Sequence, residues 1–235
     1  MHNWQEYLDN RSYPGRGIFC GLNPAGTEAV LAYFIMGRSI NSRNRIFVAG
    51  GNGLRTEAYD VAKLSDPSLI IYAPVRVLGD TTIVTNGDQT DTIYDYLARG
   101  ESWQIALASR TYEPDAPNFT PRISGLLNTT NGGCSYSLNI LKKATDNDDC
   151  LRLFWDYQAQ PGQGHLIHTY AADCEPLPPF AATEPICLPT LAESDKFGEL
   201  LWQNLNAENK VALFVRYLDL ASGQTTDHIF NKHSI

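Results

Sequence analysis

The chain has 235 residues, of which 43% are hydrophobic and 19% are charged, and its formal net charge is −8. This length and apolar content suit a globular protein with a sizeable core, and no apolar run approaches the roughly 18 residues that a membrane helix needs. The negative charge disfavours nucleic acid and an anionic membrane surface as partners, so we expect neither.

Cysteine usage and the first residues of the chain bear on where the protein works. Its five cysteines form no CxxC pair, and an odd count disfavours both a disulfide framework and a structural zinc site. The first residues lack a basic stretch followed by an apolar run, so we expect no signal peptide. A reducing cytoplasm fits these features best.

Short apolar segments bounded by Gly, Pro, Asn or Asp recur along the chain and predict strands. In the first half they are RGIFCGL (16–22), AVLAYFIM (29–36), RIFVA (45–49), LIIYAPVRVL (69–78) and TTIVT (81–85). In the second half they are PRISGLL (121–127), CSYSLNIL (134–141), LRLFWDY (151–157), HLIHTYAA (165–172) and VALFVRYLDL (211–220).

Helical spacing of apolar residues is confined to two regions, 88–110 and 194–205, the second with Ser194 or Asp195 as its N-cap. The segment 219–230 predicts a hairpin turn between two strands, and the proline-rich segment 174–189 predicts a long irregular loop or interface segment. Many strands with a few grouped helices indicate an α+β layered sandwich, formed as a single domain over residues 1–235.

Three arginines stand close together in GRSINSRNR, namely Arg38, Arg43 and Arg45. On an acidic protein such a positive island suits a small anionic ligand, although a solvated basic turn would have the same composition. In the strand 69–78, alternation places Tyr72 and Arg76 on one face. Tyr72 is then either a functional hydroxyl or a core tyrosine.

Asn86 and Gly87 separate a predicted strand from a predicted helix. Such a turn lets backbone N–H groups approach an anion at a helix N-terminus. Asp88 and Asp91 would compete for the same donors, and Asp88 or Thr90 would serve equally as an ordinary N-cap.

The segment TYEPDAPNFTPRISG (111–125) contains three prolines among charged and polar residues. Proline fixes φ and restricts the residue before it, so the loop is stiff and inexpensive to keep ordered. Ordered polar loops often carry function. This loop holds Glu113, Asp115, Asn118 and Arg122 as candidate functional residues.

Other signatures of catalysis are weak. His165 and His168 lie three apart on a predicted strand, hence on opposite faces, and cannot bind one metal ion together. The chain contains no HExxH, Walker, GxSxG or Rossmann motif. Cys20 is the one thiol to consider as a nucleophile, against the alternative of a buried structural cysteine.

Four blocks taken in order, GRSINSR (37–43), IIYAPVRVLGD (70–80), NGDQTD (86–91) and the stiff loop at 111–125, resemble the archaeal-type IMP cyclohydrolase family. The resemblance covers about residues 14–125, and it departs from the family at Gln89, where a histidine is common. It implies a four-layer αββα sandwich similar to that of N-terminal-nucleophile hydrolases. It also implies closure of the purine ring of FAICAR, the formylated aminoimidazole carboxamide ribotide, to IMP and water.

By position in these motifs, the resemblance implies a catalytic set of Arg38, Tyr72 and Glu113. It suggests substrate-binding residues among Arg43, Arg45, Asn86, Gly87, Asp91, Asn118 and Arg122. Glu113 would act as the general base, Tyr72 or Arg38 would donate to the formyl oxygen, and arginines would bind the 5′-phosphate. The reaction needs no redox cofactor and no metal.

Two other functions remain open from the sequence. One is an N-terminal-nucleophile-type amidohydrolase that uses Cys20, and the other is a non-catalytic purine nucleotide-binding module. Symmetric assembly is common for metabolic enzymes of this size, so a homo-oligomer is also possible, but the sequence does not give the oligomeric state.

Overall fold

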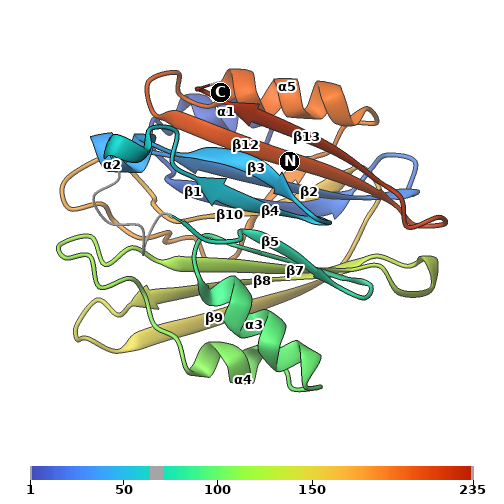
Figure 1. Ribbon diagram of the computed structural model, residues 1–235, viewed down its shortest axis with the longest axis horizontal. Coiled ribbons are helices and arrows are strands. Elements are labelled where there is room, and N and C mark those ends of the chain that lie inside the picture. Colours follow the sequence, from blue (N-terminus) through green and yellow to red (C-terminus); the bar gives the residue numbers. More distant parts are fainter. Residues whose placement is uncertain (1, 64–70, 234–235) are drawn as a thin grey trace.

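The computed structural model describes residues 2–63 and 71–233, which form two antiparallel sheets and a few helices (Figure 1). The first sheet has the strand order β11-β10-β1-β2-β12-β13. Its strands are β1 (Arg16–Leu22), β2 (Glu28–Met36), β10 (Gln163–His168), β11 (Ile186–Pro189), β12 (Lys210–Asp219) and β13 (Thr225–Asn231).

The second sheet has the strand order β3-β4-β5-β6-β7-β8-β9. Its strands are β3 (Ile46–Gly50), β4 (Gly53–Glu57), β5 (Val75–Leu78), β6 (Thr81–Thr85), β7 (Arg122–Asn128), β8 (Ser135–Lys143) and β9 (Cys150–Gln158). The α-helices are α1 (Trp4–Asp9), α2 (Ile40–Arg43), α3 (Gln89–Ala98), α4 (Trp103–Ala108) and α5 (Ser194–Asn204).

The two sheets pack face to face through a buried core to which both contribute, for example Ile18 and Leu31 from one sheet and Val84 and Ile123 from the other. At Gly125 a Cβ atom would lie only 3.0 Å from Val84 and 3.1 Å from Ile18. The missing side chain therefore allows β7 to approach the opposite sheet closely.

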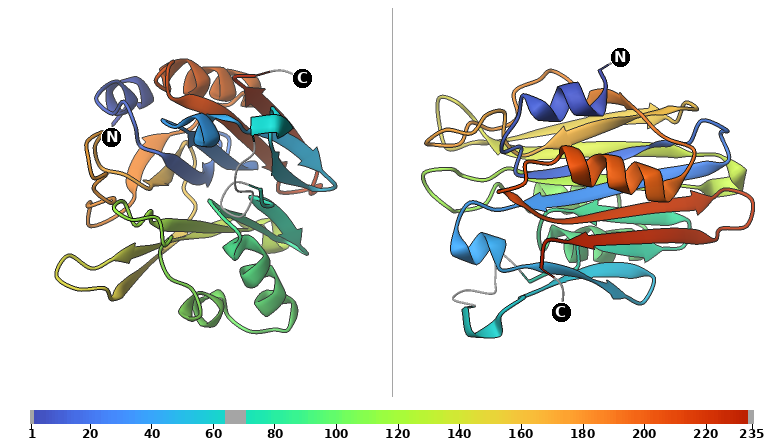
Figure 2. Two further views of the ribbon diagram at one scale, coloured as in Figure 1. Left: turned by 60° about the vertical axis from the view of Figure 1, so that its left-hand side comes forward. Right: turned by 90° about the horizontal axis from the view of Figure 1, so that it is seen from above.

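Helices cover the outer faces of both sheets (Figure 2). Trp4 of α1 and Phe197 of α5 pack with Phe19 on the first sheet, whereas Ile93 of α3 and Trp103 of α4 share a second cluster with strands of the other sheet. Strands buried on both faces explain the continuous apolar runs in the sequence. The predicted α+β class with layered sheets is confirmed.

Several predicted elements match the structure. The helical region 88–110 is two helices, because Gly100 takes a positive φ of 77° between them. The hairpin near the C-terminus is the β12–β13 connection, and Asn86-Gly87 does join a strand to a helix. His165 and His168 do face opposite sides, since His165 contacts Tyr136 and His168 contacts Tyr7.

Other predictions were wrong in detail. Within the predicted strand 69–78, β5 covers only Val75–Leu78, and positions 69 and 70 lie outside the described residues. Because the chain from 71 to 74 is irregular, alternation fails there: Tyr72 turns inward to Tyr33, while Arg76 packs on Tyr94 of α3. The N-cap of α5 is Glu193, with no side-chain cap bond, and neither Ser194 nor Asp195 has that role.

Among the α-helices and strands of the described residues, four were not predicted, namely α1, α2, β4 and β11. Each is short or polar, so its hydrophobic period is weak. Strand β11 lies at the end of the segment expected to be irregular, which is otherwise without regular structure. Among the described helices, none has the length and apolar character needed to cross a membrane.

Candidate active site

The stiff loop between α4 and β7 is ordered by its own polar groups. The N–H of Glu113 donates to the carbonyl of Thr120 at 2.9 Å, and the N–H of Thr120 donates to the Asp115 carboxylate at 2.6 Å. The Thr120 hydroxyl also bonds to Asp115 and to the Tyr170 hydroxyl. These bonds fold the loop back on itself and turn the Glu113 side chain into the protein.

Glu113 is a buried carboxylate, with 3% of its surface exposed. Burial raises its pKa, with Asp115 acting in the same direction, while Arg16, Arg122 and Arg45 oppose the shift. Within the described part of the chain, no side chain or backbone group donates a hydrogen bond to this carboxylate. Its oxygens are therefore available to a ligand, and its basicity is higher than that of an exposed glutamate.

Tyr72 lies near Glu113 and forms a pair with Tyr33 of β2, their hydroxyl oxygens being 2.7 Å apart. Burial raises the pKa of Tyr72, although Arg45, the bond to Tyr33 and Arg16 oppose the shift. Burial also raises the pKa of Tyr33. Both phenols therefore stay protonated at neutral pH. When Tyr33 donates to Tyr72, the Tyr72 proton is free to be donated onward.

Two arginines carry buried N–H groups that have no hydrogen-bond partner among the described residues. Arg45 is fully buried, and its Nε donates to the Ser42 carbonyl, but its Nη1 has no hydrogen bond. The buried Nε of Arg16 is also unpaired. Neither guanidinium forms an ion pair with any described carboxylate. Unpaired buried donors are costly, so this arrangement favours an anionic or strongly polar ligand.

Electrostatics connect the two arginines to the other groups. Burial lowers the pKa of Arg45, and the nearby charge of Arg16 lowers it further. Burial by itself would lower the pKa of Arg16 too, but Tyr170, Tyr13, Glu113 and Tyr72 raise it above its ordinary value. Arg16 is thus a permanent cation beside a buried carboxylate and several phenols.

A cleft of about 200 Å³ opens beside this group. Tyr13 and Tyr170 stack on one another in its wall, with ring centroids 5.7 Å apart. The other lining residues come from four separate segments and are Arg16, Arg38, Ser39, Ser42, Asp115, Asn118, Thr120 and Leu177. Arg16 lines this polar cleft and is electrostatically coupled to Glu113, whereas Glu113, Tyr72 and Arg45 are not among the lining residues and adjoin the cleft through Arg16. A polar cleft next to a buried carboxylate with a raised pKa is the arrangement expected of a binding or catalytic site.

Arg38 is one of the residues that line this cleft, and its guanidinium is held by acidic partners. Its guanidinium pairs with Asp173 at 2.9 Å and with Glu175 at 2.8 Å, and it lies 5.1 Å from the ring centre of Tyr13. Asn118 accepts a hydrogen bond from the N–H of Leu177. These contacts fasten the segment 173–177 over the stiff loop.

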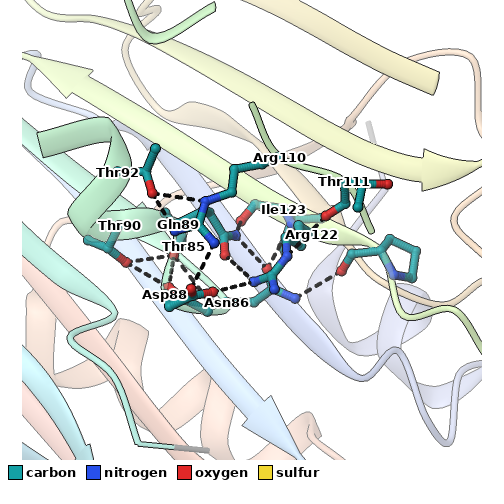
Figure 3. Close-up of polar contacts among 12 residues, drawn as sticks. Thr85, Asn86, Asp88, Gln89, Thr90, Thr92, Arg110, Thr111, Arg122 and Ile123 are labelled. Carbon is teal, nitrogen blue, oxygen red and sulfur yellow. Dashed lines mark hydrogen bonds and ion pairs between the residues drawn. The ribbon is translucent and has the colours of Figure 1, made fainter. Parts of the chain in front are cut away.

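Behind the cleft, a polar network fixes the end of the stiff loop to the start of α3 (Figure 3). Arg122 donates to Asp88 and to Gln89, both at 2.8 Å, and to the carbonyl of Thr111 at 3.0 Å. Asn86 accepts from the N–H of Ile123 at 2.8 Å and donates to the Pro121 carbonyl. The turn is compact, because a Cβ atom on Gly87 would lie 2.6 Å from Nη1 of Arg122.

The structure therefore separates the predicted residues into groups. Tyr72, Glu113 and Arg45 come together, with Arg38 and Asn118 at the adjoining cleft. Asn86, Gly87 and Arg122 lie behind them as support. Arg43 and Asp91 lie elsewhere: Arg43 binds the Gly37 carbonyl and Asn209, and Asp91 pairs with Arg76 at 2.7 Å on the outer face of the sheet.

Sequence reasoning missed Arg16, Tyr13, Tyr33 and Tyr170. Arg16 begins an apolar strand, and no motif in the sequence distinguishes it from an ordinary strand-end arginine. Cys20 is fully buried inside β1, and burial raises its pKa, which is opposite to the shift that a reactive thiol needs. No group of three or more described His, Cys, Asp or Glu side chains could hold a metal ion.

Comparison with known proteins gives one consistent result. A sequence model of a family described as IMP cyclohydrolase-like protein matches residues 13–225. A curated protein of Methanopyrus kandleri named IMP cyclohydrolase is 27% identical over 183 residues, which cover 72% of this chain and 89% of that protein.

Two further relatives of the same name come from methanogens of another genus. The protein of Methanococcus aeolicus is 26% identical over 162 residues, covering 67% of this chain and 74% of its own length. The protein of Methanococcus maripaludis is 26% identical over 164 residues, which cover 68% of this chain and 75% of that protein.

Proposed function

The chain belongs to the IMP cyclohydrolase-like family, and from this premise we propose that the cleft beside Glu113 is the active site at which FAICAR is closed to IMP and water. As a member of this family the chain is an enzyme of the IMP cyclohydrolase type, acting in purine biosynthesis. The observation that carries the site assignment is the buried Glu113 carboxylate, free of donors and flanked by the unpaired arginines.

Ring closure joins the carboxamide nitrogen of the substrate to its formyl carbon. An amide nitrogen is a weak nucleophile, so its proton must be removed as the bond forms. Glu113 accepts this proton, and the pKa raised by burial makes it a better base. The proton then passes to the former formyl oxygen, which becomes a hydroxyl.

Loss of water completes the reaction. The hydroxyl leaves with a second proton that comes from the formamide nitrogen, so both hydrogens of the water originate in the substrate. Negative charge develops on the oxygen during ring closure, and the Tyr72 hydroxyl donates to it. The unpaired N–H groups of Arg45 and Arg16 stabilise the same charge in a site that holds them in place.

Substrate positioning is the other task of the site. The reaction is intramolecular, so the protein has to select the formamide rotamer that faces the carboxamide. The stacked rings of Tyr13 and Tyr170 provide a flat wall for the imidazole base. Arg38 was expected in the catalytic set, but it lines the cleft beside Ser39 and Ser42, so in this proposal it binds the anionic 5′-phosphate end. Asn118 holds the rim at Leu177.

The supporting residues have a positioning role in this proposal. Arg122, Asn86 and Gly87 fix the loop that carries Glu113, so their loss would misplace the base. Arg43 and Asp91 stabilise surrounding segments and do not contact the substrate.

We extend the proposal to the fold and the cellular setting. The shared core between the two sheets supports one domain over residues 1–235. Its outer helices support the four-layer sandwich of N-terminal-nucleophile hydrolases as the closest fold. The five cysteines of the sequence are unpaired, which fits action in the reducing cytoplasm.

The test is conversion of FAICAR by the purified, chelator-treated protein, followed by absorbance and chromatography of IMP. Glu113→Gln should lower kcat by about 10²–10⁴-fold, because it removes a well-placed general base. Tyr72→Phe should lower kcat as well. Asp91→Asn, which changes a carboxylate outside the cleft, is the matched control and should retain wild-type activity.

A binding module would give a different pattern. Wild-type protein would then bind IMP without converting FAICAR, and Glu113→Gln would bind IMP as well as wild type does. That result would refute the catalytic assignment. Retention of full activity in Glu113→Gln would refute the base assignment alone.

A further inference from the structure

The open edges of the two sheets differ in how they are protected. On one side the sheets are joined, because the Asn231 side chain of β13 accepts from the Phe47 N–H of β3 at 2.8 Å and donates to the Phe47 carbonyl at 3.0 Å. On the other side the edges are β11 and β9. Strand β11 has four residues and ends in Pro189, both common protections of an edge.

Strand β9 has none of these protections. It is nine residues long, lacks proline, and forms the end of its sheet (Figure 1). Within the described residues, its only backbone ladder is with β8. Its outer row of N–H and C=O groups is therefore a template for another strand.

The same strand exposes apolar side chains. Leu151 and Leu153 are 41% and 36% exposed, and they lie on the face that also carries Trp155 and Tyr157. Opposite β8, this face continues the core formed by Leu138 and Ile140. Tyr157 stacks on His165 of β10 and the Trp155 indole donates to the Thr183 carbonyl, so the exposed part of the face is Leu151 and Leu153. Such a strand would be a site of nonspecific aggregation unless it has a defined partner.

We propose that β9 pairs antiparallel with β9 of a second copy of this chain, about a two-fold axis at Phe154 and perpendicular to the sheet. The pairing would join the two seven-stranded sheets into one continuous sheet. A two-fold interface requires that each residue meet its counterpart reciprocally. The sequence of β9 satisfies this requirement.

In this register Arg152 lies opposite Asp156 of the second copy, and Asp156 lies opposite Arg152. Both residues are on the helix-covered face of the sheet. The Arg152 guanidinium donates to carbonyls at the end of α4 and pairs with no described carboxylate, and Asp156 accepts only from Ser137 within the described chain. The dimer therefore supplies each charge with an opposite one.

The apolar residues pair equally well on the other face. Leu153 meets Trp155 of the second copy, and Leu151 meets Tyr157. Aliphatic–aromatic pairs directly opposite each other are among the favourable cross-strand contacts. The two-fold repeats each contact, so four such pairs form.

Other registers do not satisfy both sets of residues. A slip of one residue would bring the polar face of one strand opposite the apolar face of the other. A slip of two puts Arg152 opposite Phe154 or Gln158 of the second copy. A slip of four puts Arg152 opposite Arg152 of the second copy or beyond the end of β9. The charges therefore select the register centred on Phe154.

Charge reversal tests the interface. Sedimentation or light scattering over a concentration series should show a wild-type dimer, and Asp156→Arg should raise its dissociation constant by roughly tenfold or more, since two attractions become repulsions. The double variant Asp156→Arg with Arg152→Glu restores opposite charges and should recover the dimer. Glu199→Arg, the same charge change on the exposed face of α5, is the matched control and should leave the dimer intact.

A cross-link tests the register and does not depend on removing Arg152. The native Cys150 lies opposite Gln158 of the second copy, so Gln158→Cys should give a disulfide-linked dimer under oxidised glutathione. The same substitution in a Cys150→Ser background should not. A wild-type protein that is monomeric at all concentrations would overturn the proposal. So would a dimer that neither cross-links nor responds to charge reversal.

Discussion

Acid should destabilise this protein through one buried histidine. His168, at the end of β10, is 1% exposed, and its Nδ1 lies 2.9 Å from the carbonyl of Tyr170. A carbonyl only accepts, so Nδ1 carries the proton, and Nε2 must then accept from the Tyr7 hydroxyl at 2.6 Å. Burial lowers the pKa of His168 to about 3, and Arg11 contributes to the shift.

The direction and size of the effect follow from this shift. The unfolded chain takes up a proton at His168 below about pH 6.5, whereas the native state does so only near pH 3. Stability from this group is therefore complete above pH 6.5 and is lost as the pH falls from about 6.5 to about 3. At about 1.4 kcal/mol per pH unit, the loss between pH 7 and pH 5 is about 2 kcal/mol.

Urea denaturation at pH 7 and pH 5, followed by circular dichroism, measures the effect. Other groups also titrate in this range, so the informative quantity is the difference in pH dependence between wild type and His168→Gln, which cannot titrate. The variant should be less stable at pH 7 and should lose about 2 kcal/mol less on acidification. His233→Gln, whose ring stacks on Tyr59 and contacts neither Tyr7 nor His168, is the control. An unchanged pH dependence in His168→Gln would show that His168 does not titrate as the structure requires.

Three further perturbations test the site and its support. Gly87→Ala places a methyl group 2.6 Å from Nη1 of Arg122 and should cost about 1–3 kcal/mol of unfolding free energy together with activity; wild-type stability by urea denaturation would contradict this. Arg16→Met removes a cation that lowers the pKa of Glu113, so the acidic limb of the pH profile of kcat/KM should move to higher pH. An acidic limb at the wild-type pH would show that Arg16 does not affect the titration of Glu113. Cys20→Ala should cost roughly 1 kcal/mol of stability and retain activity, since this thiol is buried; abolished activity in a folded variant would revive the nucleophile hypothesis.

The long apolar strands could be predicted because both of their faces are buried. Runs such as those in β1, β2 and β12 are continuous, and the residues that bound them mark their ends. Weakly periodic elements could not be predicted in this way. Helix α2 has four residues, none of them buried, so its sequence carries no core-facing pattern.

In the site, residues with a local sequence signal could be predicted, whereas contacts between distant residues could not. The prolines around Glu113 indicated an ordered loop, and the loop is ordered as expected, by the bonds of Thr120 and Asp115. Tyr72 was a candidate by its motif, but its partner Tyr33 lies 39 positions away in the sequence. A hydrogen bond between distant strands leaves no local signal.

The sequence by itself determined the secondary structure of the long strands, the stiffness of the loop at 111–125 and the family of the chain. Only the tertiary structure decided which charges meet. It left Arg45 and Arg16 with unpaired donors next to a buried carboxylate, and it directed Arg43 and Asp91 to other partners. The physical reason is that strand propensity and turn chemistry act over a few residues, whereas burial and pairing of charges depend on segments brought together by packing of the two sheets.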